Sequence, residues 1–531
     1  DLKEVHVAMM AFSTCVGVGL FLQGGRAIYL AGPGLAFIAY IIGGSIEWAT
    51  MASLGEMTAL FPIEGPIFAF TCHFLDQGLG YAAGWLICFS WTIVVAAEIL
   101  AITQLFKFRF DPHYLQKLQY PDPSLGWKVG QETSPAIWCV IFMAIILAVN
   151  FLPIRRYGQV EYCVGTIKIL FFVLLIMFNI VLSGLQLVPR GGRFWTYNAP
   201  YGFAVQNYTI PLATAKFPYE GNYARKVITG DAGRLAGMWS AITTTIFSMT
   251  GFETVAISAA ENRDLRRSEA IKLATRKTGI RVVILYTLAI ATVGLNVPYT
   301  DPYLRDMSIN SINFGQDSPF ILSAVYNHLR GWPHFFNAFY IFSATTCGIN
   351  ALYNASRTLH AMARIKEAWP SWGPVQSGRE RLERTHAGIP FVAITTCWLF
   401  SFLAFLATKP FPAKVLGRIA TNSVASHLVV NIVICLTYLR FYKRIKLAAG
   451  GQDPTVDQHL ARAFDRDNRR YPYKSRGQYM RALYALFGSL LVCLFNGWRS
   501  FVSPMSIPDI LVAYISVRSP QSHSFCSATP L

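Results

Sequence analysis

The chain has 531 residues, of which 53% are hydrophobic and 14% are charged, and its formal net charge is +18. A soluble globular domain carries nearer a quarter charged residues, so the composition excludes a soluble protein. Several apolar runs reach the roughly 20 residues that cross a bilayer, and the sequence therefore predicts a polytopic integral membrane protein. The charge is expected to reflect membrane topology and contact with anionic lipid, and no nucleic acid partner is predicted.

Eleven apolar spans are predicted in chain order. They cover residues 5–30, 34–60, 79–105, 135–152, 159–188, 237–260, 279–297, 334–356, 390–408, 416–439 and 482–502. A twelfth run begins at Ile507 and stops at Val517. That run is too short to cross a bilayer as a helix, so we expect a truncated twelfth span followed by a polar tail.

Basic residues and cysteines set the expected topology and chemistry. If the N-terminus is cytoplasmic, the inside loops hold 26 Lys and Arg residues and the outside loops hold 15. The positive-inside rule favours this orientation.

The 10 cysteines lie mostly singly in apolar runs. They form no CxxC pair, so neither a disulfide framework nor a metal site is predicted.

The first span contains the interruption Gly17-Val18-Gly19. Each glycine weakens a helix by roughly 1 kcal/mol relative to alanine. In a membrane, a broken helix is tolerated only where its backbone groups are buried in protein or line a wet cavity. The step is therefore predicted to offer backbone to a ligand, and close helix packing through small residues is the alternative.

The sixth span contains a second interruption. An inverted repeat predicts a broken counterpart five spans after the first. The sixth span reads Phe247-Ser248-Met249-Thr250-Gly251-Phe252-Glu253, with a mid-span glycine between hydroxyl residues and a carboxylate. Free N–H groups at helix ends attract anions and free carbonyls attract cations. Such a pair of breaks suits a zwitterion and favours an amino acid over a sugar.

The chain resembles the fungal amino acid permeases of the amino acid–polyamine–organocation superfamily from Leu2 to about Ser516. The order and spacing of several motifs carry the resemblance. They include Gly17-Val18-Gly19-Leu20-Phe21, Ala31-Gly32-Pro33-Gly34, Ser53-Leu54-Gly55-Glu56-Met57, Gly251-Phe252-Glu253, Ala355-Ser356-Arg357-Thr358-Leu359 and Thr437-Tyr438-Leu439-Arg440-Phe441-Tyr442-Lys443. After Val517 the family continues apolar, and this chain departs from that pattern.

The resemblance implies a fold and an organisation. The fold is an all-α polytopic membrane protein with a five-plus-five inverted-repeat core of the LeuT type and C-terminal helices. The core is expected over 1–445, with spans one to five at 5–188 and spans six to ten at 237–439. A cytoplasmic basic loop at 446–481, span eleven with the truncated span twelve at 482–517, and a polar tail at 518–531 complete the chain.

The resemblance also implies proton-coupled import of amino acids across the plasma membrane, without a cofactor. In the family the first break binds the substrate carboxylate and the sixth-span break binds the amino group. The corresponding residues here are Thr14, Val16, Gly17, Val18, Gly19, Phe247, Ser248, Thr250 and Gly251. An aromatic residue four positions before the sixth-span glycine is a gate in related bacterial antiporters. Phe247 stands there, and core packing is its alternative role.

Lys168, Glu98 and Glu253 are the candidates for proton coupling or gating. Lys168 lies some 15 Å past Gly158, deep for a snorkelling lysine. A buried ammonium is costly, so such a lysine can exchange a proton near neutral pH. Glu98 is expected to line the pocket or move protons, with helix packing as the alternative. Glu253 is expected either to move protons or to hold the broken helix by accepting backbone N–H bonds.

Glu56 lies near the cytoplasmic end of span two and is predicted to form an inner gate with loop cations. Two other functions stay open beside the proton-coupled importer. One is a transporter-like amino acid sensor, and the other is a non-functional permease with a broken C-terminus. An enzyme is not predicted, because the sequence holds no membrane-embedded metal cluster, nucleophile motif or paired catalytic histidines.

Overall fold

The computed structural model describes residues 4–185, 208–212, 224–228, 230–259, 269–304, 315–386, 388–408, 410–450, 465–466, 471, 477–501, 510 and 514. A helix occupies each of the eleven ranges predicted as spans. Most of the predicted truncated twelfth span, the tail 518–531 and most of the basic loop 446–481 lie outside the described residues.

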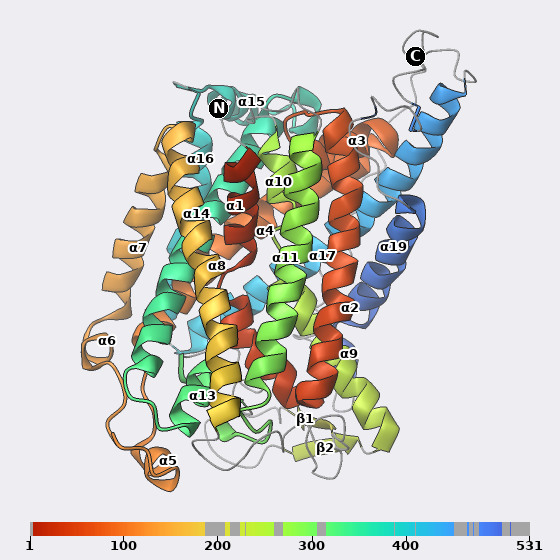
Figure 1. Ribbon diagram of the computed structural model, residues 1–531. Helices are drawn as coiled ribbons and strands as arrows, with labels where there is room; N and C mark the ends of the chain where they lie inside the picture. Colours follow the sequence, from red (N-terminus) through yellow and green to blue (C-terminus); the bar gives the residue numbers. More distant parts are fainter. Residues whose placement is uncertain are drawn as a thin grey trace.

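The described chain is mostly helical (Figure 1). The helices at the predicted spans are α1 (Glu4–Cys15) with η1 (Gly19–Gln23), α2 (Gly24–Leu60), α4 (Gln77–Phe106), α7 (Pro135–Asn150), α8 (Ile154–Leu185), α9 (Gly230–Ser248) with α10 (Thr254–Ile257), α11 (Glu269–Val293), α14 (Trp332–Ala363), α16 (Phe391–Leu399) with η8 (Phe400–Thr408), α17 (Pro410–Ala449) and α19 (Gln478–Phe495).

A kink inside α2 separates the first and second spans. Gly32 has φ +76° and is followed by Pro33. Only glycine adopts this backbone conformation without strain, and proline has no N–H to continue the helical hydrogen bonds. The end of the first span therefore turns directly into the second.

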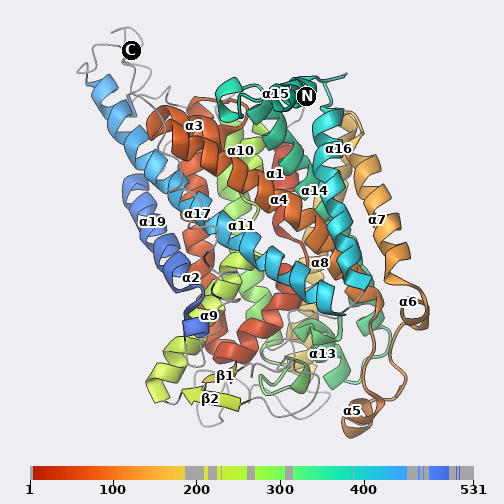
Figure 2. The ribbon, with the colours of Figure 1, turned by 180° about the vertical axis from the view of Figure 1, so that it is seen from behind.

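The loops predicted on opposite sides of the membrane gather at opposite ends of the bundle (Figures 1 and 2). The lower end in Figure 1 carries α5 (Pro112–Lys117), α6 (Lys128–Glu132), α13 (Pro319–Tyr326), β1 (Tyr208–Leu212) and β2 (Ala224–Ile228). The upper end carries the start of α1, α3 (Pro66–Phe74) and α15 (Gly373–Glu383). This separation agrees with the predicted alternation of the loops.

A short hairpin in one loop adds to the all-α architecture that the sequence predicts. Strands β1 and β2 pair antiparallel, with Tyr208 opposite Ile228 and Leu212 opposite Ala224. Each strand has only 5 residues, and Pro211 lies inside the first. The hairpin gives no clear alternating pattern in the sequence, because strands this short leave little periodicity to read.

A buried cluster ties two of the lower-end loops together. Asp301 accepts hydrogen bonds from the Tyr114 hydroxyl at 2.7 Å and the Tyr326 hydroxyl at 2.6 Å. Burial, and then the nearby Asp301 carboxylate, raises the pKa of Tyr114. Its phenol therefore stays protonated and continues to donate, which holds α5 against α13.

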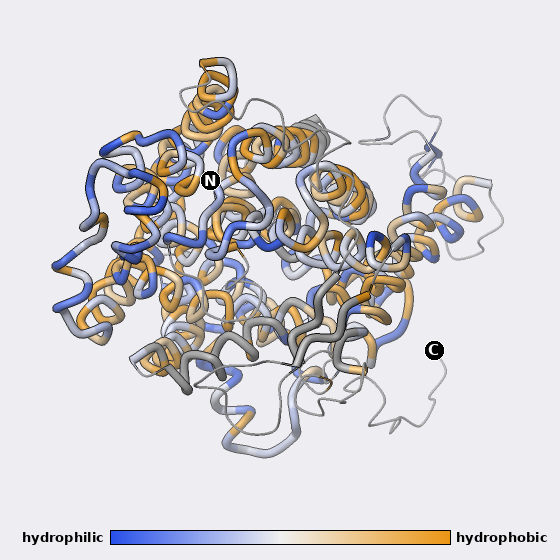
Figure 3. Tube along the Cα trace, turned by 90° about the horizontal axis from the view of Figure 1, so that it is seen from below, coloured by the Kyte–Doolittle hydropathy of each residue, from blue (hydrophilic) through white to orange (hydrophobic). Residues whose placement is uncertain are grey.

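The exterior of the bundle is apolar, as a lipid-facing surface requires. Along α8, Leu170 is 63% exposed, Met177 53% and Leu185 62%. Figure 3 looks along the helices, whose residues are largely hydrophobic. Among the described residues, five helical stretches are long and apolar enough to cross a membrane: Val5–Leu60, Gln77–Phe106, Ile154–Leu185, Ala425–Ala449 and Gln478–Phe495. The chain is an integral membrane protein.

Candidate functional site

Both predicted helix breaks are present. The α-helix of the first span ends at Cys15, and the short π-helix η1 begins only at Gly19. In the sixth span, α9 ends at Ser248 and α10 begins at Thr254. Between them Gly251 has φ +119°, a conformation that L-residues rarely adopt.

The two breaks are in contact because each presents a glycine to the other. A Cβ added at Gly251 would lie 3.0 Å from Thr14 Cγ2 and 3.2 Å from the Cys15 nitrogen. A Cβ added at Gly19 would lie 3.1 Å from the Ser248 Cα. Spans one and six are thus in contact at their breaks. These contacts are close packing through small residues, the alternative raised by the sequence, and ligand binding at the breaks stays a prediction.

Lys168 caps the carbonyl end of α1. Its Nζ donates to the Ser13 carbonyl at 2.8 Å, the Val16 carbonyl at 2.6 Å and the Ser343 carbonyl at 3.3 Å. The Ser343 hydroxyl also donates to the Val16 carbonyl, at 2.8 Å. The last carbonyls of a helix lack intrahelical partners, and the helix dipole favours a cation there. Lys168 is fully buried, so it does not snorkel to the surface.

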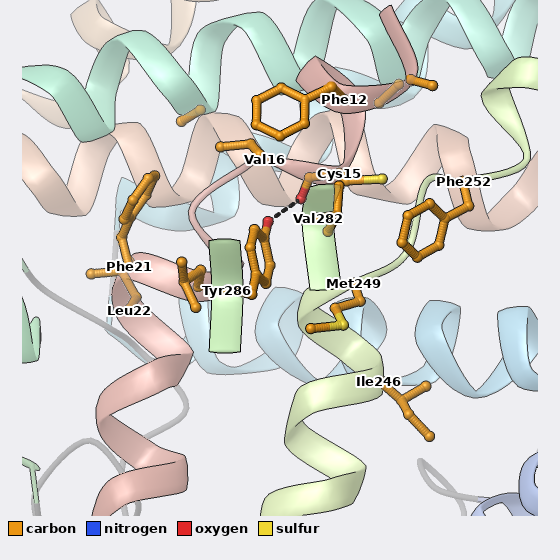
Figure 4. Close-up of a cluster of buried hydrophobic side chains, with 14 of the residues drawn as sticks. Phe12, Cys15, Val16, Phe21, Leu22, Ile246, Met249, Phe252, Val282 and Tyr286 are labelled. Atoms are coloured by element: carbon orange, nitrogen blue, oxygen red, sulfur yellow. Dashed lines mark hydrogen bonds between the residues drawn. The ribbon is translucent and has the colours of Figure 1, made fainter. Parts of the chain in front are cut away.

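The intervening carbonyls of the break are also satisfied by side chains. The Tyr286 hydroxyl donates to the Cys15 carbonyl at 2.7 Å (Figure 4), and the Cys347 thiol donates to the Thr14 carbonyl at 3.2 Å. The Thr14 hydroxyl donates to the Met10 carbonyl at 2.8 Å, within α1. Four consecutive carbonyls, from Ser13 to Val16, are therefore held in place by surrounding helices.

Opposite helix ends meet where the two breaks touch. The first turn of a helix leaves its N–H groups without carbonyl partners, and the last turn leaves carbonyls. Gly19 begins η1 and lies against Ser248, which ends α9. An N–H-rich end and a carbonyl-rich end thus lie side by side, which suits the carboxylate and the ammonium group of one zwitterion.

Glu98 of α4 faces the first break. Its side chain interacts with the Cys347 thiol, the Lys168 charge and the Val18 backbone amide. A Cβ at Gly17 would overlap Glu98 Oε1 and would lie 2.8 Å from the Cys347 sulfur. Glu98 therefore lies beside the N–H groups that the sequence assigns to the substrate carboxylate.

Glu253 does not cap the helix that follows it, which was one of its two expected roles. It precedes α10 but makes no side-chain capping hydrogen bond there. Its Oε1 instead pairs with His427 Nε2 of α17 at 3.0 Å, and both side chains are buried. Nearby, Glu47 of α2 accepts from the Asn431 amide at 2.9 and 3.2 Å. The carboxylate thus joins the sixth-span break to α17 rather than capping its own helix.

Sequence reasoning missed several buried ionisable residues around the site. Glu47, Glu161 and His427 lie within predicted apolar spans and are buried. An ionisable residue at membrane depth is by default a functional candidate, and that signal was available for all three.

Phe247 and Thr250 are two further predicted residues of the sixth-span break. Phe247 lies in the last turn of α9, and its side chain is outside the described part of the structure. Its gating role stays a prediction. Thr250 lies in the turn between α9 and α10. The neighbouring Met249 and Phe252 pack into the apolar cluster that includes Phe12 (Figure 4).

The prediction that Glu56 pairs with a loop cation is confirmed. Arg466 Nε lies 2.8 Å from Glu56 Oε1, and the Arg466 guanidinium covers the Tyr442 ring at 4.8 Å. Tyr438 and Tyr471 donate hydroxyl hydrogen bonds to the same carboxylate, at 2.7 and 3.2 Å. This cluster joins α2, α17 and the loop that follows α17.

Removing the Arg466 side chain is expected to destabilise the protein. Arg466→Ala leaves Glu56 buried without its cation, which costs about 3 kcal/mol. The unfolding midpoint of the purified protein should fall, measured by tryptophan fluorescence on heating. The control is Arg364→Ala, which breaks the half-exposed pair with Glu64 at 2.6 Å and should cost less than about 1 kcal/mol. Equal shifts for the two variants would contradict the account of the Glu56 cluster.

The described residues contain no group of three or more His, Cys, Asp or Glu arranged to hold a metal ion. The nine cysteines in this part of the chain are free thiols. The groups that surround the first break are backbone carbonyls and amides, the Lys168 ammonium, the Glu98 carboxylate, and side-chain hydroxyl and thiol groups.

The structure is a helical membrane protein with two facing helix breaks, and comparison with known sequences gives its family. The profile of the amino acid permease family matches residues 6–518, and the chain belongs to that family. Amino acid transport is accordingly its class of activity.

Individual relatives are similar at a modest level. The chain is 26% identical to the basic amino-acid permease of Saccharomyces cerevisiae, covering 97% of this chain and 78% of the relative. It is 26% identical to the lysine/arginine permease of Candida albicans over the same shares. It is 27% identical to the sensor component SSY1 of S. cerevisiae, covering 94% of this chain and 58% of that protein. A solved manganese transporter of Eremococcus coleocola is similar with a TM-score of 0.48 and 13% identity, covering 97% and 92% of the two chains.

Proposed function

We propose that this protein imports amino acids across the plasma membrane by proton symport, with alternating access around the two helix breaks. The observation that supports it most is the contact between the breaks, with a buried ammonium fixing the carbonyl end of α1. An N–H-rich helix end beside a carbonyl-rich one offers both charges that a free amino acid needs.

The substrate is held by backbone more than by side chains in this proposal. The carboxylate binds the first break at Thr14, Val16, Gly17, Val18 and Gly19. The ammonium group binds the sixth-span break at Phe247, Ser248, Thr250 and Gly251. Backbone groups at helix ends recognise the common part of every amino acid, and preference among side chains then depends on the surrounding helices.

Lys168 is the proton carrier in this proposal. A charged Lys168 holds the carbonyls of Ser13 and Val16, and a neutral amine holds them less strongly. Loss of its proton therefore loosens the end of α1. Substrate binding and the protonation state become linked through the same backbone segment. Glu98 interacts with both the Lys168 charge and the Val18 backbone amide, so in this proposal it changes how strongly protonation of Lys168 and substrate binding are coupled. Glu253 connects the sixth-span break to α17 through His427.

Two features support the inverted repeat. The breaks fall in spans one and six. A short helix follows span two, and another follows the counterpart span seven: α3 at the upper end and α13 at the lower end (Figure 1). Equivalent helices at opposite ends are what a two-fold axis in the membrane plane produces. Spans one to ten then form the transport core, and the N-terminus is cytoplasmic by the distribution of basic residues.

Cationic amino acids are the first substrates to test. Two relatives are named for basic amino acids or for lysine and arginine.

Competition binding tests how the substrate is held. Purified protein is incubated with labelled lysine, and unlabelled lysine, lysine methyl ester and cadaverine compete. Free lysine should displace the label, whereas the ester and the diamine, which lack the carboxylate charge, should compete at least about tenfold less well. Equal competition by cadaverine would contradict recognition of the carboxylate at the first break. If lysine does not bind, the same test with other labelled amino acids decides the substrate.

A transporter-like sensor is the second candidate, favoured by the similarity to the sensor component SSY1. A sensor binds amino acids at the same breaks without catalysing their flux. Binding without uptake or exchange in proteoliposomes would favour the sensor, and counterflow of labelled substrate would favour the transporter.

A further inference from the structure

Glu161 of α8 lies in a buried polar cluster that the proposed substrate site does not use. Its side chain is fully buried, and the Asn350 amide donates to its Oε2 at 2.8 Å. Its Oε1 is buried and has no hydrogen-bond partner among the described residues. A buried carboxylate oxygen without a partner is costly, and a proton on the carboxyl group relieves that cost.

The cluster begins directly beside Lys168. The Ser13 carbonyl accepts from Lys168 Nζ at 2.8 Å, and the Ser13 hydroxyl accepts from the Asn350 amide at 3.2 Å. The Ser13 side chain also lies against Glu161. Ser13, in the last turn of α1, therefore contacts both the Lys168 ammonium and the Asn350 amide that binds the Glu161 carboxylate.

Charge balance also links the two residues. The Lys168 ammonium interacts electrostatically with the carboxylates of both Glu161 and Glu98. Two ionised carboxylates and one ammonium would leave a net negative charge buried in a medium of low dielectric. The group is neutral when one carboxyl is protonated, so it is suited to hold one more proton than Lys168 alone.

The cluster extends toward the end of α8 predicted to be cytoplasmic. Glu161 precedes Lys168 by two helical turns, about 10 Å at 1.5 Å per residue. One turn further, the Tyr157 hydroxyl donates to the Asn350 side-chain oxygen at 2.8 Å, and its ring stacks on Tyr353. The titratable and charged groups around this stretch are Cys15 of α1, Glu98 of α4, Tyr157 and Lys168 of α8, and Cys347, Tyr353 and Arg357 of α14.

We propose that Glu161 is a second proton-carrying residue, which takes the proton from Lys168 and releases it toward the cytoplasm. In the first step the Lys168 ammonium loses a proton and becomes a neutral amine, while the Glu161 carboxylate gains that proton. In the second step the Glu161 carboxylic acid loses it to cytoplasmic water and becomes a carboxylate again. The Ser13 hydroxyl lies on the route of the first step. This inference rests on the proposed proton symport.

The test compares Glu161→Gln with wild type in proteoliposomes holding the full chain and an entrapped pH indicator. Labelled lysine is used first, or whichever amino acid the binding test identifies. Glutamine keeps the shape and can still accept from Asn350, but its amide neither gains nor releases a proton near neutral pH. Substrate-driven acidification of the lumen and gradient-driven accumulation should fall by at least about tenfold, while exchange without a gradient stays within about twofold. Glu161→Asp should restore part of the accumulation with an altered pH profile.

Glu132→Gln is the matched control, because Glu132 is exposed in α6 and should behave as wild type. Accumulation by Glu161→Gln at the wild-type level would overturn the proposal. Loss of exchange together with accumulation would also overturn it, since that result assigns Glu161 a structural role. If accumulation by the wild-type protein does not depend on the proton gradient, the proposed symport itself is wrong. This outcome is distinct from the other two.

Discussion

Replacing Lys168 by methionine is expected to abolish proton-driven accumulation of substrate. The change removes the only group that donates to both the Ser13 and Val16 carbonyls among the described residues. It also removes the proposed proton carrier. Accumulation in proteoliposomes under an inward proton gradient should fall by more than about tenfold. Binding should weaken less, because the Ser343 hydroxyl still holds the Val16 carbonyl.

Lys168→Arg separates the two roles of the lysine. Arginine donates to carbonyls but does not release its proton in proteins. We expect this variant to keep a measurable affinity for substrate and to lose gradient-driven accumulation. Full accumulation by the arginine variant would show that Lys168 acts only as a structural donor, and the assignment of the proton would then be wrong.

Replacing Gly251 by alanine is expected to weaken substrate binding by about tenfold or more. The added Cβ would lie 3.0 Å from Thr14 Cγ2, and the backbone at φ +119° is strained for any L-residue. The two breaks must then separate, which moves the N–H and carbonyl ends away from each other. The affinity for labelled amino acid, measured with the purified protein, checks this.

Gly184→Ala is the matched control for Gly251→Ala. A Cβ at Gly184 of α8 would meet nothing within 4 Å. Alanine stabilises a helix by up to about 1 kcal/mol relative to glycine, so the folded state of this variant should be slightly more stable. The variant should bind substrate with wild-type affinity. Wild-type affinity in the Gly251 variant would mean that contact between the breaks is not needed for binding.

The sequence predicts most of this fold because long apolar runs have few structural solutions in a membrane. A helix lies at each of the eleven expected ranges, and both breaks fall at the glycines that the pattern indicates. Gly17 and Gly251 were recognisable since a glycine in the middle of an apolar span is unfavourable unless the backbone is needed there. The hairpin of β1 and β2 was not predicted, because its strands are too short to show an alternation of apolar and polar residues.

The side-chain network around the breaks was only partly predictable. Lys168 was found from its depth in an apolar helix, but its carbonyl partners depend on how α1, α8 and α14 pack. The pair between Glu253 and His427 joins residues 174 positions apart in the chain, which no local pattern specifies. Asn350 was not singled out, because an asparagine in an apolar helix gains its role only from Glu161 and Ser13 on neighbouring helices.

Uptake of labelled amino acid into proteoliposomes, with and without an inward proton gradient, tests the central claim most directly. Lysine is the first substrate, and the full set of amino acids follows. The account predicts accumulation above the external concentration only when the gradient is present, with acidification of the lumen as substrate enters. A correctly folded protein that transports no amino acid, or whose uptake is the same without the gradient, would contradict it.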